Sequence, residues 1–207
     1  MPKAVIIGGA KIGNYERALS FIEDGDFLIY CDSGLAHSDK LGEPNLIIGD
    51  FDSHENPGLD VETLVLPHIK DDTDTVFAAK QVIERGFKSC LMLGASGSRL
   101  DHTLGNISAM LMLENAGVSA VLADDYCEME IAGKEEKQIP CDYPYFSLMS
   151  VFGEADEITV KGALYPLENA KITPDYQYGV SNEPLPGQTA SVTVGKGKLL
   201  LIKVVSE

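Results

Sequence analysis

The sequence predicts two domains, an α/β domain built on a parallel sheet and, after it, a small all-β domain that resembles a sandwich. In residues 1–125, short continuous apolar runs alternate with stretches of helical periodicity. Such runs are typical of strands covered on both faces, and their alternation with helices is typical of a parallel sheet. From Tyr126 onward, apolar and polar residues alternate and prolines and glycines recur, which indicates half-exposed strands. We therefore expect domains at 1–125 and 126–207.

In the first domain, the pattern predicts helices over Thr75–Arg85 and Asp101–Ala116. Each has apolar residues at helical spacing and is followed by a glycine, Gly86 or Gly117, and glycine is a common residue just after the last helical turn. The predicted strands are Ala4–Ile7, Phe27–Cys31, Leu46–Ile48, Thr63–Leu66, Cys90–Leu93 and Ala120–Ala123.

In the second domain, Glu157–Lys161 and Ser191–Val194 alternate in the manner of strands with one face exposed. The strongest hairpin pattern joins Ala190–Val194 to Lys198–Val205 through the glycine-bearing segment 195–197. A short glycine-containing loop between two such runs predicts a hairpin.

Composition excludes some classes of partner. The 207-residue chain has a formal net charge of −16, whereas nucleic acids and anionic membranes bind clustered Lys and Arg. A nucleotide substrate stays compatible with this charge, because it needs only a metal ion and a few local cations. No apolar run reaches the length of a membrane span or a secretion signal. The four cysteines show no CxxC spacing, so we expect reduced thiols in a cytoplasmic protein.

Acidic residues gather after one predicted strand and again before a predicted helix. Asp50 and Asp52 follow Leu46–Ile48, and Asp72 and Asp74 precede the helix that starts near Thr75. Crowded carboxylates are unfavourable unless something positive lies between them, and Mg²⁺ prefers carboxylate and phosphate oxygens. The pattern predicts a Mg²⁺–phosphate site. For the second pair, capping of the helix is a competing role.

Four polar or glycine-rich loops follow predicted strands: Gly8–Ala10, Asp32–Gly34, Gly49–Ser53 and Gly94–His102. In an open parallel sheet, ligands bind beyond the carboxyl ends of the strands, so these loops should meet at one edge. The first loop does not match the GxGxxG pattern, and a plain tight turn remains an equal alternative there. Asp32-Ser33-Gly34 has the competing interpretation of a turn or cap.

The last of these loops adds groups that can bind an anion. Gly94 and Gly97 allow backbone N–H groups to approach phosphate, and Arg99 offers a fork of donors. Asp101 begins the following helix, on which His102 and Asn106 are four residues apart and so share a face. The remaining histidines, which have no metal-type spacing, are expected to be ordinary surface residues: His37, His54 and His68.

Taken in order, these motifs resemble those of the thiamine pyrophosphokinase family. The resemblance rests on Asp32–Gly34, Leu46–Ser53, Lys70–Asp74 and Gly97–Asn106, and it continues in the tail with Val160–Leu167 and Gly179–Glu183. It spans nearly the whole chain. Ser33 and Ser98 stand where many relatives have glycine, and Tyr165 stands where some have tryptophan.

The resemblance implies a transferase that moves a diphosphoryl group from ATP to the hydroxyl of thiamine and gives thiamine diphosphate and AMP. It implies a homodimer in which the catalytic domain of one subunit and the β domain of its partner share the thiamine site. The implied catalytic residues are Asp32, Asp50, Asp52 and Asp74, the last three as Mg²⁺ ligands. The implied nucleotide-binding residues are Ser33, Asp72, Arg99, Asp101, His102 and Asn106, and those for thiamine are Ser181 and Asn182.

Two alternatives remain open at this point. A related diphosphokinase that acts on a hydroxymethylpterin would use similar acidic residues, although Ser181-Asn182 favours the thiamine type. A nucleotide-binding module without catalysis is the other. Which aspartate accepts the hydroxyl proton, and whether one or two metal ions bind, are also left open by the sequence.

Overall fold

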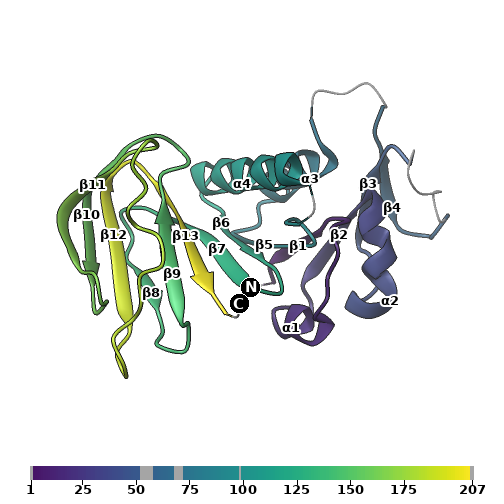
Figure 1. The fold of residues 1–207 in the computed structure, drawn as a ribbon. Coiled ribbons are helices and arrows are strands. Elements are labelled where there is room, and N and C mark those ends of the chain that lie inside the picture. Colours follow the sequence, from purple (N-terminus) through teal and green to yellow (C-terminus); the bar gives the residue numbers. More distant parts are fainter. Residues whose placement is uncertain (1, 52–57, 68–71, 98, 206–207) are drawn as a thin grey trace. The chain divides into compact units, whose positions relative to one another are not determined.

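The apolar runs of the first half form a parallel sheet. The computed structural model describes residues 2–51, 58–67, 72–97 and 99–205, and the chain divides into two units, Met1–Asp125 and Tyr126–Glu207. In the first unit the strands lie in the order β4-β3-β2-β1-β5-β6 (Figure 1), and each pair of neighbours is parallel. The strands are β1 (Ala4–Ile7), β2 (Phe27–Cys31), β3 (Leu46–Gly49), β4 (Glu62–Val65), β5 (Ser89–Leu93) and β6 (Ser119–Ala123).

Helices cover both faces of this sheet. The helices α1 (Tyr15–Ser20) and α2 (Ser38–Leu41) contribute Ala18 and Leu41 to a core cluster with alternate residues of the central strands, such as Val5 and Ile7. The helices α3 (Asp74–Glu84) and α4 (Leu100–Asn115) pack on each other, and α3 contacts β1, β2 and β3. A 3₁₀ helix, η1 (Asp32–His37), joins β2 to α2.

The elements predicted for the first half are confirmed. All six strands form, each within one residue of the predicted start and end. Five of them are largely buried apolar runs, as strands covered on both faces must be, whereas β4 is the partly exposed edge strand of the sheet. The predicted helices form as α3 and α4, and each is followed by a glycine with positive φ, 78° at Gly86 and 77° at Gly117.

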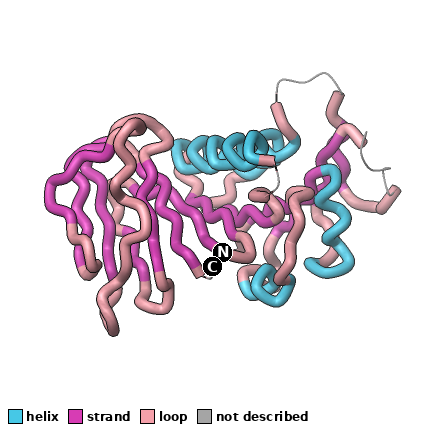
Figure 2. The backbone as a smooth tube through the Cα atoms, viewed as in Figure 1, coloured by secondary structure: helices cyan, strands magenta, loops and turns pink. Residues whose placement is uncertain are grey.

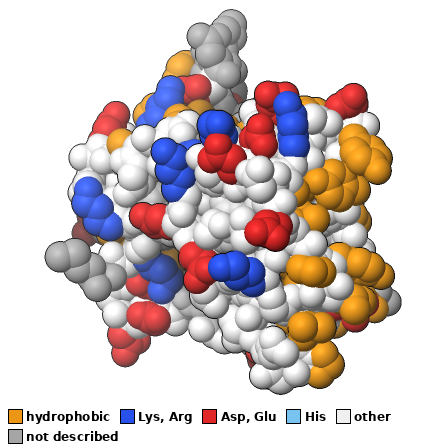
Figure 3. Space-filling view, turned by 90° about the vertical axis from the view of Figure 1, so that its left-hand side faces the viewer, with side chains coloured by type: hydrophobic (Ala, Val, Ile, Leu, Met, Phe, Trp, Pro, Cys, Tyr) orange, Lys and Arg blue, Asp and Glu red, His pale blue; other side chains and the backbone are white. Residues whose placement is uncertain are grey.

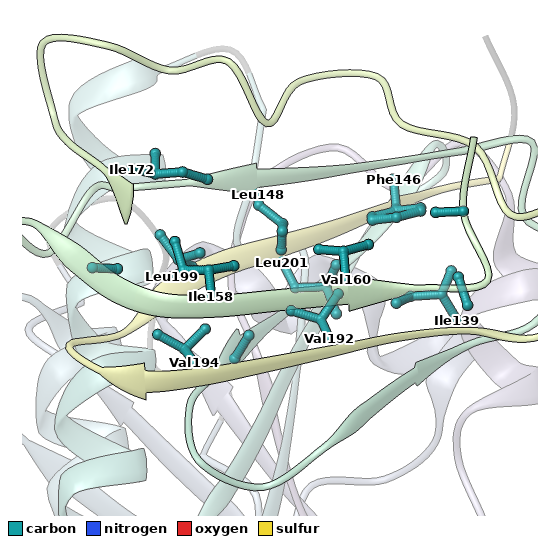
Figure 4. Packing of buried hydrophobic residues seen from close by; sticks show 14 residues of the cluster. Ile139, Phe146, Leu148, Ile158, Val160, Ile172, Val192, Val194, Leu199 and Leu201 are labelled. Atoms are coloured by element: carbon teal, nitrogen blue, oxygen red, sulfur yellow. The ribbon is translucent and has the colours of Figure 1, made fainter. Parts of the chain in front are cut away.

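The second unit is built from antiparallel strands in two sheets, as predicted for its fold class. One sheet has the order β7-β13-β9 and the other β11-β10-β12-β8; no helix forms among residues 126–205 (Figure 2). Side chains of both sheets share one core, in which Phe146, Ile158 and Leu201 are fully buried (Figure 4). The strands are β7 (Cys127–Ala132), β8 (Lys137–Ile139), β9 (Tyr145–Met149), β10 (Ala155–Lys161), β11 (Leu167–Ile172), β12 (Ala190–Lys196) and β13 (Leu199–Val204).

The hairpin predicted around residues 195–197 is wrong. Both strands form, but β12 pairs with β10 and β8, whereas β13 pairs with β7 and β9. Val192 and Val194 face Leu199 and Leu201 across the shared core. The turn at Gly197, with φ of 78°, therefore carries the chain from one sheet to the other, a route that the alternating pattern alone does not distinguish from a hairpin.

Candidate functional site

A cavity lies where the strand order of the first unit changes direction. From β1 the chain proceeds to β2, β3 and β4 on one side, while β5 and β6 lie on the other. Ligands of open α/β sheets bind beyond the carboxyl ends of the strands at such a point. A cavity of about 240 Å³ occurs here. Its lining consists of Gly8, Gly9, Ala10, Ser33, Thr75, Gly94, Ala95, Ser96, Gly97, Arg99, His102, Thr103 and Asn106.

The loops after β1 and β5 are in close backbone contact. The N–H of Gly8 donates to the carbonyl of Leu93 at 2.9 Å, and the N–H of Ala10 donates to the carbonyl of Gly94 at 2.9 Å. A Cβ atom added to Gly8 would lie 2.5 Å from the Gly94 oxygen, closer than non-bonded atoms allow. The loop therefore forms a tight turn, and it also lines the cavity, so its contact with a ligand stays a prediction.

The turn after β2 is strained and lies against the same loops. Asp32 has φ of 42°, and a non-glycine residue held at positive φ costs about 1–3 kcal/mol. A Cβ on Gly34 would lie 2.2 Å from the carbonyl oxygen of Ile7, and one on Gly9 would overlap the Ser33 side chain. The Ser33 side chain therefore borders the cavity, and Asp32 precedes it in a conformation that only the surrounding packing maintains.

Further aspartates lie at the same edge of the sheet. Asp50 directly follows β3 and is half-buried, and a Cβ on Gly49 would lie 3.2 Å from the Cα of Asp32. Asp74 is the first residue of α3, and its carbonyl accepts a hydrogen bond from the Cys31 thiol at 3.7 Å. Asp50 and Asp74 are thus both placed beside the Asp32 turn. Asp52 lies outside the described residues.

Neither Asp72 nor Asp74 is the N-cap of α3, the competing role considered for this pair. Thr73 caps α3, because its Oγ1 accepts a hydrogen bond from the N–H of Val76 at 3.3 Å. The carboxylate of Asp72 instead forms an ion pair with Lys80. Asp74 remains in the first turn, where the helix dipole favours a negative charge.

Carboxylate ligands for Mg²⁺ are available here in the number that the ion uses. Among the residues that the structure describes, which omit Asp52, no group of three Asp, Glu, His or Cys side chains is arranged to hold a metal ion. Mg²⁺ beside phosphates usually takes one or two carboxylates and completes its shell with phosphate and water oxygens. The donor chemistry of Asp50 and Asp74 fits that requirement.

Arg99 and Asp101 form a bidentate ion pair at the N-terminus of α4. The Arg99 Nε donates to Asp101 Oδ1 at 3.2 Å, and Nη2 donates to Oδ2 at 2.6 Å. The hydrogen bond from Arg99 lowers the pKa of Asp101 to about 2, and the same contact raises the pKa of Arg99. Both side chains are largely exposed. The pair orients the guanidinium while leaving its other N–H donors available beside the cavity.

The N-terminal part of α4 lines the cavity on the side of the β5 loop. His102 and Asn106 both border it, as their shared helical face predicts. Asn106 is buried and donates from Nδ2 to the carbonyl of Ala95 at 2.6 Å. Thr103 accepts from the N–H of Gly97 at 3.2 Å through Oγ1. These two bonds hold the loop over residues 95–97 in place against the helix.

The sequence did not indicate three of the residues that line the cavity, and the burial of one histidine was predicted wrongly. Thr75, Ser96 and Thr103 border the cavity, but hydroxyl residues near helix starts are too common to stand out in a sequence. The expectation that His37 is an ordinary surface residue is wrong. It is only 7% exposed and contacts the hydroxyl of Tyr15 at 2.7 Å. His54 and His68 lie outside the described residues.

In the second unit, Ser181 and Asn182 have different environments. Ser181 is exposed and has φ of 57°. Asn182 is 7% exposed; its Oδ1 accepts from the N–H of Tyr165 at 3.0 Å and its Nδ2 donates to the carbonyl of Tyr165 at 2.8 Å. The Asn182 side chain therefore holds the Tyr165 backbone, whereas the Ser181 side chain faces solvent.

Comparison with known proteins gives matches over both units. The family model "Thiamin pyrophosphokinase, catalytic domain" matches residues 18–122, and "Thiamin pyrophosphokinase, vitamin B1 binding domain" matches residues 128–199. A thiamine pyrophosphokinase of Bacillus subtilis (strain 168) is 28% identical over 136 residues, which are 65% of this chain. The match spans 63% of the length of that relative.

Solved structures match the fold over almost the full chain. The crystal structure of thiamine pyrophosphokinase from Bacillus subtilis has a TM-score of 0.85 at 23% identity and covers 99% of this chain and 100% of that one. The thiamin pyrophosphokinase structure from Geobacillus thermodenitrificans has a TM-score of 0.83 at 22% identity, with 99% and 97% covered. At these identities the likeness of the structures establishes a common fold.

Proposed function

Because the chain belongs to the thiamin pyrophosphokinase family, we propose that it transfers a diphosphoryl group from ATP to the hydroxyl of thiamine, giving thiamine diphosphate and AMP. The observation that carries the proposal is the match of both family models, in order, to the two units. The cavity between the β1 and β5 loops supports it, because glycine-rich backbone that can approach phosphate lines this cavity. Asp50 and Asp74 lie at the same edge of the sheet, directly after β3 and at the start of α3.

In this proposal the first unit binds ATP with Mg²⁺. The Gly8–Ala10 and Gly94–Gly97 loops approach the phosphates, assisted by Arg99, which Asp101 orients. Ser33, His102 and Asn106 border the same cavity, and Asp72 supports the start of α3 through its ion pair with Lys80. Asp50, Asp52 and Asp74 would hold Mg²⁺, which when bound neutralises charge on the phosphate oxygens.

The reaction breaks the bond between the β-phosphorus and the oxygen that bridges it to the α-phosphate. The hydroxyl oxygen of thiamine forms the new bond to the β-phosphorus, and AMP leaves with the bridging oxygen. The proton of the hydroxyl passes to a carboxylate, and Asp32 is our candidate because it lies in a strained turn directly before Ser33, which lines the cavity. Fixed positions of these groups, rather than covalent chemistry by the protein, supply the catalysis.

The second unit is proposed to bind thiamine and to join two subunits. The vitamin B1 binding model supports the first role, and the exposed Ser181 can contact a ligand, whereas the Asn182 side chain acts through the Tyr165 backbone. Exposed apolar side chains support the second role, and Figure 3 shows hydrophobic side chains gathered along one side of the view. In this unit the exposed large apolar side chains between residues 164 and 180 are Leu164, Tyr165, Tyr176, Tyr178 and Val180.

We also propose that the protein acts in the cytoplasm with its thiols reduced. Its four cysteines form no disulfide. None of the helices in the described part of the chain is long and apolar enough to span a membrane.

The decisive experiment incubates the pure protein with ATP, Mg²⁺ and thiamine and separates the products. We expect AMP and thiamine diphosphate in equal amounts. ADP with thiamine monophosphate would contradict the proposed transfer, and nucleotide binding without any AMP would indicate a non-catalytic module. A hydroxymethylpterin offered in place of thiamine should give no product; turnover of the pterin alone would favour the related diphosphokinase. Light scattering that finds only monomer at micromolar concentration would exclude the dimer.

The proposed metal ligands are tested by removing one charge at a time. Asp50→Asn and Asp52→Asn should each abolish turnover while the unfolding temperature stays near that of the wild type. Asp39→Asn, the same chemical change at an exposed position of α2, should leave turnover unchanged. Near wild-type activity in either of the first two variants would refute the metal role of that residue.

A further inference from the structure

His37 connects two of the loops that border the cavity. It is the last residue of η1, the 3₁₀ helix that begins at Asp32. Its Nε2 lies 3.0 Å from the carbonyl oxygen of Ala10, and its Nδ1 lies 2.7 Å from the hydroxyl of Tyr15. The ring is 7% exposed. A polar ring that is buried in this way is kept in place by its hydrogen bonds.

The partners determine which ring nitrogen carries the proton. A carbonyl oxygen can only accept, so Nε2 must donate to Ala10. In the neutral ring the other nitrogen is then an acceptor, and the Tyr15 hydroxyl donates to it. Each polar atom of the ring therefore has a defined partner, and in the neutral ring the direction of both bonds is fixed. Tyr15 also packs against the ring, with centroids 5.9 Å apart.

The hydrogen bond between His37 and Ala10 restrains loops that border the cavity. Ala10 follows Gly8 and Gly9, and all three border the cavity. At the other end of η1, Ser33 lies so close to Gly9 that an added Cβ would overlap it. Strained conformations such as the φ of 42° at Asp32 persist only where the surrounding structure enforces them. The contact between His37 and Ala10 fixes the far end of η1 to the glycine loop and so restrains both the loop and the Asp32 turn.

We propose that His37 is a positioning residue for the proposed diphosphoryl transfer: through its bond to the Ala10 carbonyl it fixes the distance between the phosphate-binding Gly8–Ala10 loop and the Asp32 turn. The inference rests on the proposed function of this cavity. It assigns His37 no contact with the substrate. Its loss should affect nucleotide binding and turnover together, because both loops move relative to each other.

Two substitutions of matched polarity separate this role from a general structural one. In His37→Gln the amide nitrogen occupies nearly the position of Nε2 and can donate to Ala10. In His37→Asn the amide nitrogen occupies nearly the position of Nδ1, on the Tyr15 side, and cannot reach Ala10. We expect the Gln variant to remain within about threefold of the wild type in kcat/KM for ATP. The Asn variant should lose about ten- to hundredfold, with a higher KM for ATP and a lower kcat, since a misplacement of about 1 Å can cost that much.

The measurements are kcat and KM for ATP, together with the Kd for Mg²⁺–ATP by calorimetry, all well below the unfolding temperature of each variant. If Asn and Gln variants have equal kcat/KM and equal Kd, the inference is wrong. If the Asn variant does not fold, His37→Met, which has the length of Gln without a donor, takes its place in the same comparison.

Failure of the proposed function gives a different result. A wild type that binds Mg²⁺–ATP but gives no AMP refutes the transfer reaction, while a weaker Kd in the Asn variant alone still supports the positioning role of His37 at a nucleotide site. A wild type that neither binds the nucleotide nor gives AMP refutes both.

Discussion

The close contact between Gly8 and Gly94 makes the effect of a single methyl group calculable. In Gly8→Ala the new Cβ would lie 2.5 Å from the Gly94 oxygen, whereas real Cβ atoms essentially never approach within 3.0 Å. The β1 and β5 loops must therefore separate by at least about 0.5 Å. The atoms that an added Cβ at Gly8 would meet belong to the backbone of the β5 loop, so no flexible side chain can absorb the shift.

The separation has an energetic and a functional consequence. Overpacking of this kind costs about 1–3 kcal/mol. The hydrogen bond from Gly8 to Leu93, now 2.9 Å, lengthens and loses part of the about 1 kcal/mol that such a bond contributes. We expect the free energy of unfolding to fall by about 1–4 kcal/mol. The KM for ATP should rise, because the cavity lies between the two loops.

The matched control is Gly105→Ala in α4, where a new Cβ meets nothing within 4 Å. Alanine is favoured over glycine inside a helix by about 0.5–1 kcal/mol, so this variant should be more stable than the wild type. Urea denaturation of the three proteins measures both effects. The reasoning fails if Gly8→Ala unfolds at the urea concentration of the wild type, or if the two variants change stability in the same direction.

Three further predictions concern single contacts. Titration by NMR should give a pKa of about 2 for Asp101, and this pKa should rise toward its ordinary value in Arg99→Gln. Because the folded-state pKa is lowered, the contribution of the pair to stability is complete above the ordinary pKa and is lost as the pH falls through about 2. An unchanged pKa in the variant would exclude Arg99 as the cause. Asn182→Ala should lower the free energy of unfolding by about 1–3 kcal/mol, since it leaves the part-buried N–H and C=O groups of Tyr165 without their partner. A urea midpoint equal to that of the wild type would contradict this. Asp125→Asn should speed amide hydrogen exchange at Gly13 or Asn14 about fivefold. The Asp125 carboxylate accepts from both N–H groups, at 2.8 and 2.9 Å, whereas the amide of the variant offers only one oxygen. Exchange at wild-type rates at both positions would show that the carboxylate does not hold this loop.

The sequence was most informative where one physical requirement dominates. A strand covered on both faces must be apolar throughout, and the runs at Ala4–Ile7 and Phe27–Cys31 form strands with those bounds. The carboxyl ends of such strands lie at one edge, which is why the loops at Gly8, Ser33 and Gly94 could be expected to meet. They do meet, around the cavity.

Features that depend on partners far along the chain could not be predicted in this way. Alternation predicts β12 and β13 as strands, but the choice of partner depends on the core that all strands of the unit share. The burial of His37 depends on Tyr15 and Ala10, which no local pattern connects to it. Residues outside the described ranges, Asp52 among them, keep the role expected from the sequence as a prediction.

The position of β13 has a consequence for synthesis of the chain. It comes after β7 and β9 in the sequence, yet it lies between them, paired with β7 through Cys127–Ala132 and with β9 through Tyr145–Met149. It also supplies Leu199 and Leu201 to the core. During translation the first unit can fold as it emerges, since domains generally fold from the N-terminus.

The second unit must wait until residues 199–204 have left the ribosome. Until then β7 and β9 each lack the strand that pairs with them in this sheet, and unpaired strand edges are sites of aggregation. A chain that is interrupted or cleaved before residue 199 therefore keeps an intact α/β unit beside an unfinished β unit. Residues 199–204 thus determine whether the β unit can form, and a chain without them exposes the unpaired strand edges that make incompletely folded species prone to aggregation.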